Sequence, residues 1–262
     1  MRKLWLAAII PFGCLAQDHI AVPIQDPGRA VTMKVTVMRG SVTIRAYNGR
    51  EVLVDSKGSG SSQTTATTHD GLHRIDGGGS DMTITSQNNV VEITDHGMRN
   101  GDVTIQTPTN TTVKVKALSG GQVTIEGVSG DTEAQNLNGS LSITNVSGSV
   151  VANSLNGSVT VVLTNATLGK PMSFTSLNGK IDVTLPADVK ADFAMKSMHG
   201  EIYSDFDVKL KPSGNPITED TGKNSGRYRV KVDATVSGTV NGGGSEFQFR
   251  TMNGNIYIRK GK

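Results

Sequence analysis

The densest group of side chains that could hold a metal ion lies between residues 69 and 76. His69, Asp70, His73 and Asp76 bring two imidazoles and two carboxylates into one short segment. A metal site requires such ligands to converge with tetrahedral or octahedral geometry. The surrounding residues are rich in Gly, Ser and Thr and show no apolar alternation, which is typical of a loop. We therefore interpret these four as loop residues and predict neither a metal site nor a cofactor.

The segment GGGSDMTI, residues 77–84, resembles one copy of a calcium-binding nonapeptide. A calcium-binding roll needs consecutive Gly-Gly-x-Gly-x-Asp copies, whose carboxylates and carbonyls build an oxygen cage between turns. Only this imperfect copy is present, so a turn is the better interpretation.

Four carboxylates, Asp182, Glu201, Asp205 and Asp207, are spaced so that they could share one face of a β-structure. Glycoside hydrolysis uses two carboxyl groups about 5–10 Å apart, one of them with a raised pKa. Sugar-active enzymes also present aromatic platforms, and the single Trp lies at position 5, in a segment that we expect to be removed. Solvated charges on a repetitive surface are the favoured interpretation, and a polysaccharide-active enzyme on a β-helix frame is the alternative.

The elements that would position these side chains come from a short repeat with the pattern apolar–x–Gly–x–apolar–x–apolar. Its leading residues are Met38, Met98, Leu118, Val128, Leu137, Val146, Leu155, Leu177, Met198 and Met252, with one inserted residue at Met98 and Leu118. The apolar–x–apolar end alternates with period two and is rich in Val, Ile and Thr, which indicates short strands. No apolar stripe of helical period extends beyond two turns outside the first residues.

Each part of the repeat has an expected role. Asn-Gly pairs such as 138–139 and 156–157 supply residues that tolerate positive φ, so we expect sharp turns there. The leading Leu, Val or Met is expected to tuck its side chain under the corner. The predicted core consists of these leading residues and Val42, Ile44, Val123, Ile125, Leu141, Ile143, Val150, Ala152, Val159, Val161, Ile181, Val183, Ile202, Ile256 and Ile258.

Two all-β architectures fit nine-residue steps: a β-solenoid, or an antiparallel meander or sandwich joined by Asn-Gly hairpins. LNG units begin at Leu137 and Leu155, and VSG units at Val128 and Val146, so like follows like after eighteen residues. This alternation favours the two-sided coil of a solenoid, with Asn138 stacked on Asn156. We expect Val31–Val37 and the tail at 259–262 to cap its ends.

Outward positions between paired core residues could form a surface that binds a ligand. They read Thr43, Thr104, Thr124, Glu133, Ser142, Val151, Thr160, Asp182, Tyr203 and Tyr257. The threonines suggest an ice-binding array, but Glu133, Val151 and Asp182 interrupt them. Tyr203 and Tyr257 could form an aromatic patch for a glycan or a peptide, or could simply cover a strand face.

The first sixteen residues differ from the rest of the chain. Arg2 and Lys3 precede an apolar run that ends in Pro and Gly, which is the layout of a secretory signal peptide and is too short to span a membrane. We predict cleavage between Ala16 and Gln17; the alternative is a lipoprotein anchored at Cys14. The expected localisation is periplasmic, cell-surface or secreted.

Composition limits the mature chain, which we expect to be one elongated β-repeat domain over residues 17–262, with loops at 58–71 and 211–226. Gly is 31 of 262 residues, against about 7 % in average proteins, and aromatic residues are only 4 %, so the core should be thin. Removing Arg2 and Lys3 leaves 24 basic and 23 acidic residues. A net charge of +1 gives no argument for nucleic acid or an anionic membrane as partner.

The run of LNG and VSG units, followed by GGGSEFQFRTMNGNIYIRK near the C-terminus, resembles the bacterial "putative adhesin" β-repeat domains of unknown function. The resemblance covers roughly residues 30–260 and is strongest from 118 to 258. It implies a β-repeat fold, commonly behind a signal peptide, and supplies no catalytic residues.

Together these observations predict an exported, non-catalytic structural or interaction protein of the cell envelope, with an adhesin-like role. Its partner would be a glycan or an envelope protein, bound by a flat repetitive face or a long loop. The alternatives are the polysaccharide-active enzyme and an envelope sensor or scaffold.

Overall fold

The fold is seen in a computed structural model that describes residues 20–58, 68–69, 72–73, 82–96, 101–165, 169–211, 217–219, 229–231 and 235–261. Side chains are described for these residues except at 57–58, 68–69, 72–73, 217–219 and 229–231. Every regular element in the described ranges is a β-strand. The all-β prediction is confirmed.

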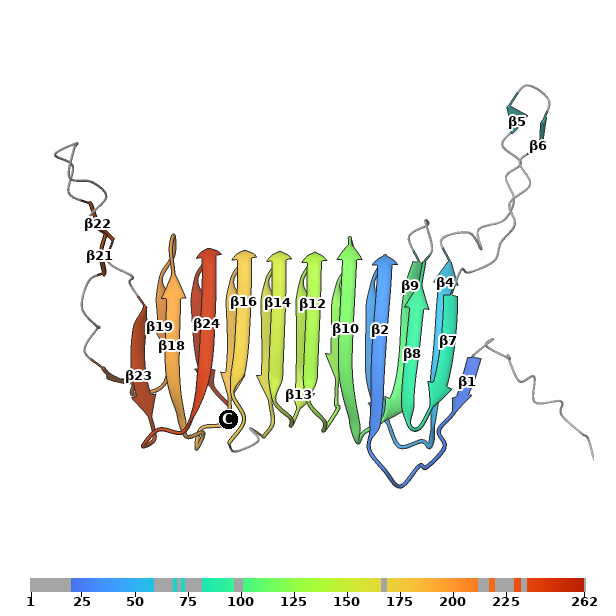
Figure 1. The fold of residues 1–262 in the computed structure, drawn as a ribbon, viewed down its shortest axis with the longest axis horizontal. Helices are drawn as coiled ribbons and strands as arrows, with labels where there is room; N and C mark the ends of the chain where they lie inside the picture. The colour runs from blue at the N-terminus through green and yellow to red at the C-terminus, as the bar shows by residue number, and fades with distance from the viewer. Residues whose placement is uncertain are drawn as a thin grey trace, which may run out of the picture.

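Two large sheets lie face to face, and Figure 1 looks onto the outer surface of one of them. That eleven-stranded sheet has the order β20 (Lys209–Leu210), β23 (Val236–Val240), β18 (Ala191–Ser197), β24 (Ser245–Asn253), β16 (Met172–Asn178), β14 (Val150–Asn156), β12 (Thr132–Asn138), β10 (Thr111–Ser119), β2 (Val31–Arg39), β8 (Val90–Asp95) and β7 (Met82–Gln87).

The ten-stranded sheet behind it has the order β1 (Ile20–Pro23), β4 (Glu51–Gly58), β9 (Gly101–Pro108), β3 (Val42–Tyr47), β11 (Val123–Glu126), β13 (Leu141–Val146), β15 (Val159–Leu163), β17 (Ile181–Leu185), β25 (Ile256–Lys260) and β19 (Ile202–Ser204). Two small antiparallel hairpins stand apart: β5 (Thr68–His69) with β6 (Leu72–His73), and β21 (Ile217–Glu219) with β22 (Arg229–Lys231). The expected loops at 58–71 and 211–226 thus contain β5 and β21.

Each repeat pair forms one coil, with one strand in each sheet. Thr132 on β12 pairs in parallel with Val150 on β14, and Leu141 on β13 with Val159 on β15, so one coil takes eighteen residues. The solenoid prediction is confirmed. The alternative, an antiparallel meander, does not describe the stacked coils, whose strands pair in parallel. The reason is that the nine-residue unit turns a corner into the facing sheet instead of reversing within its own sheet.

Two coils stand out of sequence order. The pair β2–β3 lies between β8–β9 and β10–β11, and the pair β24–β25 lies between β16–β17 and β18–β19. We predicted that Val31–Val37 and the tail at 259–262 cap the ends of the stack, and this prediction was wrong. Arg259 and Lys260 belong to β25, which pairs with β17 on one side and β19 on the other.

The ends of the stack are closed mainly by antiparallel strands. At one end β4 pairs with β9, β1 with β4, and β7 with β8; at the other β23 pairs with β18 and β20 with β23. An antiparallel strand breaks the coil repeat, so another coil cannot continue the stack in register. This arrangement protects the sheet edges from pairing with other chains.

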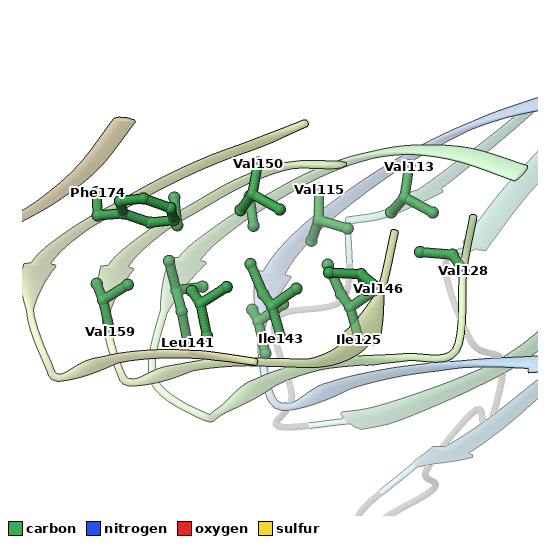
Figure 2. Packing of buried hydrophobic residues seen from close by; sticks show 14 of the residues in the cluster. Val113, Val115, Ile125, Val128, Leu141, Ile143, Val146, Val150, Val159 and Phe174 are labelled. Atoms are coloured by element: carbon green, nitrogen blue, oxygen red, sulfur yellow. The ribbon is translucent and has the colours of Figure 1, made fainter. Parts of the chain in front are cut away.

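The core is the thin layer of inward side chains between the two sheets, shown in Figure 2. Of the strand residues that we predicted to be buried, all are buried except Ile202, which is partly buried on edge strand β19. Sequence analysis missed the aromatic part of the core. Phe249 is fully buried, with its ring centroid 5.2 Å from that of Phe174 and 5.4 Å from that of Phe193.

The glycine of each repeat is explained by the spacing of stacked corners. A Cβ added to Gly157 would lie 2.2 Å from the carbonyl oxygen of Gly139, the equivalent residue one coil earlier. The same contact with a neighbouring glycine recurs at Gly40, Gly121, Gly139, Gly179, Gly200 and Gly254. Gly139 has a φ of 158°, but Asn138, Asn156 and Gly157 do not have positive φ, so the positive-φ argument fails for the 156–157 pair. What the corner requires of Gly157 is the absence of a side chain.

The residue two positions before the Asn-Gly pair forms a second regular feature. It points inward and is buried, and its polar group donates to a glycine carbonyl of the neighbouring coil. Ser154 Oγ donates to the Gly139 oxygen over 3.0 Å, and Ser176 Oγ to the Gly157 oxygen over 2.9 Å. Asn136 and Thr251 make the equivalent bond. So does Ser197, which is partly buried and precedes a His-Gly pair. These bonds satisfy corner carbonyls that the sheet ladders leave unpaired.

Candidate binding surfaces

The two tyrosines singled out from the sequence do lie together. Tyr203 on β19 and Tyr257 on β25 are register partners, with ring centroids 5.2 Å apart and planes inclined by 7°. They lie outward on the last two strands of the ten-stranded sheet, and Tyr203 is 46 % exposed. We call these two residues the tyrosine pair. Because β19 is the last described strand of its sheet, no other strand of the described residues covers Tyr203 there.

Polar groups hold the rings in place. Glu201 accepts a hydrogen bond from the Tyr203 hydroxyl, and this bond to a carboxylate raises the pKa of Tyr203. Asn255 Nδ2 donates to the Tyr257 hydroxyl over 3.0 Å. Each hydroxyl therefore has a fixed partner, and the aromatic surface is preorganised.

A charged pair borders the tyrosines. Arg259 donates to Asp182 from Nε over 2.7 Å and from Nη2 over 3.2 Å, and this pairing raises the pKa of Arg259. The Arg259 guanidinium also lies 5.4 Å from the ring centroid of Tyr257, within range of a cation–π contact. Lys180 Nζ is 3.6 Å from the second Asp182 oxygen.

The structure shows which groups contact three of the four carboxylates of the enzyme hypothesis. Asp182 is neutralised by two cations, the opposite of the apolar environment that keeps a catalytic acid protonated. Glu201 holds a tyrosine, and Asp205 Oδ2 accepts from the Lys260 backbone N–H over 3.3 Å. Asp207 follows the buried Phe206. These contacts give Asp182, Glu201 and Asp205 roles in holding the end coils together.

The leading residue of each repeat behaves differently on the two sides of the coil. Val128 and Val146, which lead the VSG units, are buried as predicted. Among the described residues, the leading Leu and Met of the other units are 37–58 % exposed, so their predicted burial was wrong. Each follows an inward-facing residue of its strand, and the pleat therefore turns it outward. They are Met38, Leu118, Leu137, Leu155, Leu177, Met252 and Met198. Met98 lies outside the described residues.

These exposed residues form a continuous line, which we call the apolar stripe. The strands that lead into it, β2, β10, β12, β14, β16, β24 and β18, are consecutive neighbours in the eleven-stranded sheet. All of the stripe residues lie at the carboxyl ends of these strands, marked by the arrowheads in Figure 1. Neighbouring side chains are one strand spacing apart, about 4.8 Å.

An asparagine ladder runs beside the stripe. Asn156 Nδ2 donates to Asn138 Oδ1 over 2.9 Å, Asn178 to Asn156 over 2.8 Å, and Asn253 to Asn178 over 2.7 Å. The stacking of Asn138 on Asn156, which we predicted from the eighteen-residue spacing, is confirmed. The amides satisfy one another along the stack, so this edge of the stripe is fixed in position.

The outward threonines fall on one sheet. Thr104, Thr43, Thr124, Ser142 and Thr160 are register partners in the ten-stranded sheet, followed by Asp182. Glu133 and Val151, which we took to interrupt this row, lie on the other sheet. The next outward column contains Arg45, Glu126 and Val162, so the hydroxyls make a single row, not the flat array that ice binding needs.

The four candidate metal ligands at residues 69–76 lie almost wholly outside the described residues. Asp70 and Asp76 are not among the described residues, and of His69 and His73 only the backbone is described, on β5 and β6. Within the described ranges, no three His, Cys, Asp or Glu side chains gather as metal ligands. The GGGSD part of 77–84 is also outside, as are Cys14, Ala16 and Gln17. No helix that could cross a membrane occurs in the described part of the chain.

Comparisons with known proteins give one family and two similar solved structures. The family model described as Toastrack DUF4097 matches residues 78–241. A crystal structure described as a "putative cell adhesion protein" from Clostridium sporogenes is 12 % identical, with a TM-score of 0.47, covering 93 % of this chain and 98 % of its own. A "putative adhesin" from Bacteroides fragilis is 11 % identical, with a TM-score of 0.39 and coverages of 92 % and 95 %. A search of curated proteins finds no match.

Proposed function

The chain belongs to the Toastrack DUF4097 family, and we propose that it is an exported, non-catalytic binding module of the cell envelope that recognises a glycan. The observation that carries this proposal is the tyrosine pair: an exposed, rigid aromatic surface at one end of a solenoid, bordered by paired charges. The resemblance to adhesin-like domains seen in the sequence supports the same kind of role.

The chemistry of the tyrosine pair suits a sugar. The C–H face of a pyranose ring packs against an aromatic ring, while its hydroxyls need fixed donors and acceptors at the rim. Glu201, Asn255 and Arg259 place such groups beside the rings without requiring rearrangement. A site that is already ordered loses little conformational entropy on binding.

Glycan binding is tested with a glycan array followed by titration of any ligand found. We expect Tyr203→Ala to weaken binding by about tenfold, the upper range for one aromatic contact. Tyr47→Ala is the matched control, because Tyr47 lies near the other end of the same sheet, and it should leave binding unchanged. Equal loss in both variants, or no ligand in the array, argues against a glycan site here.

The wild-type protein also tests the enzyme alternative. Turnover of a bound glycan would refute a non-catalytic role. Export is tested by the mass of the protein recovered from its native cell. Cleavage after Ala16 leaves a chain starting at Gln17, whereas a diacylglyceryl group on Cys14 indicates the lipoprotein. A chain that retains residues 1–16 in the cytoplasm contradicts export.

A further inference from the structure

The tyrosine pair belongs to a longer stack of flat groups. Its two rings are nearly parallel with centroids 5.2 Å apart, a separation at which rings overlap face to face and do not lie edge to edge. The Arg259 guanidinium lies 5.4 Å from the Tyr257 centroid and is held by Asp182 on β17. Because β17 and β19 flank β25, Arg259 covers the face of Tyr257 opposite Tyr203. The stack therefore runs from Arg259 through Tyr257 to Tyr203.

The stack ends in an uncovered side of an aromatic ring. One face of Tyr203 packs against Tyr257, and the other points beyond β19, the last described strand of the sheet. We call this outer side the free face of Tyr203. Since Tyr257 has a group on each of its faces, a ligand that stacks on the tyrosine pair does so on the free face.

The edge of β19 presents hydrogen-bonding groups beside the free face. The Glu201 carbonyl oxygen and the Asp205 nitrogen both bond to β25 over 2.9 Å. Backbone groups alternate in direction along a strand, so those of Ile202 and Ser204 point away from β25 toward the open edge. Their N–H and C=O groups can donate to and accept from the hydroxyls of a sugar stacked on Tyr203.

A carboxylate lies at the rim of the free face. Glu201 Oε2 accepts the hydroxyl hydrogen of Tyr203, and the same bond raises the pKa of Tyr203. Donation to a carboxylate makes the ring richer in electrons, which strengthens its attraction for a cation. Within the described part of the chain, Glu201 Oε1 has no hydrogen-bond partner and Glu201 forms no ion pair. The rim therefore offers an ionised oxygen to a ligand.

The cations of this end of the sheet lie on the opposite side of the stack. Lys180 and Arg259 both contact Asp182 on β17. Asp205, which follows β19, also interacts electrostatically with Arg259. Glu201 keeps its charge without a cationic partner among the described residues. A negatively charged sugar on the free face would be repelled by it, and a positively charged one attracted.

We propose that the free face of Tyr203 binds an amino sugar, a hexose unit whose nitrogen is not acetylated and carries a proton. This inference rests on the proposed glycan function and names its ligand class. The C–H face of the sugar packs on the ring, the ammonium group pairs with Glu201 Oε1, and the hydroxyls bond to the edge of β19. An equivalent contact exists at the other end of the stack, where the Arg259 cation lies over Tyr257.

The test compares two oligosaccharides that share a backbone and differ only in acetylation. They are the β-1,4-linked hexamers of glucosamine and of N-acetylglucosamine, titrated into the protein by calorimetry slightly below neutral pH. We expect the wild type to bind the glucosamine hexamer about tenfold more tightly, because acetylation removes the positive charge. This preference should decrease as salt is raised.

Glu201→Gln removes the charge at the rim and keeps the shape of the side chain. Its preference for the glucosamine hexamer should fall to about twofold or less, with binding of the acetylated hexamer unchanged. Glu126→Gln is the matched control and should keep the wild-type preference, because Glu126 is an outward carboxylate of the same sheet, on β11 and paired with Arg45. Tyr203→Ala should weaken binding of both hexamers. Unchanged melting temperatures confirm that the variants fold.

Equal binding of the two hexamers by the wild type, or an equal fall in preference in both glutamine variants, overturns the amino-sugar assignment. If the acetylated hexamer or another glycan still binds in a manner that depends on Tyr203, the proposed glycan function stands without it. If no glycan binds, both fail. A lysine hexapeptide is the remaining probe. Binding tighter than that of the glucosamine hexamer, and lost in Tyr203→Ala, would assign the free face to a basic peptide instead.

Discussion

Replacing Gly157 by alanine tests the account of the corners directly. The added Cβ would lie 2.2 Å from the Gly139 oxygen and 2.4 Å from the Gly139 carbon, both atoms of the neighbouring backbone. Non-bonded carbon and oxygen atoms do not approach closer than about 3.0 Å, so the two coils would have to separate by roughly 0.8 Å at this corner. The φ angle of Gly157 is not positive, so the cost is steric.

The expected magnitude follows from the bonds that span this corner. Ser154 Oγ donates to Gly139 over 3.0 Å, Asn156 Nδ2 to Asn138 over 2.9 Å, and Leu141 N to the Ser158 oxygen over 2.9 Å. Separation by nearly 1 Å would take each bond beyond ordinary length, and each contributes about 1 kcal/mol. We therefore expect Gly157→Ala to lower the free energy of unfolding by about 3 kcal/mol.

Urea denaturation followed by far-UV circular dichroism measures this loss. Gly120→Ala is the matched control, because Gly120 has a φ of 73° but open space around it. That variant should lose only about 1 kcal/mol, the cost of a left-handed conformation. If Gly157→Ala loses no more than Gly120→Ala, close stacking of the corners is not what selects glycine, and the reasoning is refuted.

Two further predictions concern charge and core packing. Burial alone would raise the pKa of Asp131, but hydrogen bonds from Lys170 and Ser149 outweigh it and leave the pKa below its ordinary value. A lowered folded-state pKa stabilises the protein above the unfolded value of about 4, and this contribution is lost as the pH falls through the folded value. We expect Asp131→Asn to cost about 0.5 kcal/mol at neutral pH, since the site is partly solvated, and a difference from wild type that persists below pH 3 in chemical denaturation would contradict this. Phe249→Ala should cost about 3–5 kcal/mol, because its ring is fully buried between Phe174 and Phe193. A loss below about 2 kcal/mol in thermal denaturation would show that the two sheets collapse around the cavity.

The local pattern determined most of the fold. A strand pair such as Leu141–Ile143 alternates apolar and polar residues, and that alternation alone decides which side chains face inward. The eighteen-residue period of LNG units fixed the coil length and the stacking of Asn138 on Asn156, because equivalent residues in a solenoid must be register neighbours. The tyrosine pair was found for the same reason, as the same outward position in two copies of the repeat.

The leading residues show where the local pattern was insufficient. Val146 and Leu155 occupy the same place in the repeat, yet one is buried and the other exposed, since the two corners of the coil turn differently. Hydropathy favours burial of both, and the alternation of VSG and LNG units does not by itself tell which leading residue is exposed. The apolar stripe could be recognised only once the corner geometry was known.

Long-range strand order was decided only by the tertiary structure. The β2–β3 and β24–β25 coils carry the same repeat as the others, so their sequences fit almost any position in the stack. Their places depend on the antiparallel strands that close each end, and pairing of that kind leaves no periodic signal. That order also places Tyr257 next to Tyr203 at the end of the sheet. The sequence by itself therefore determined the coil and its core, while the tertiary structure decided which coils are neighbours and what surface they share.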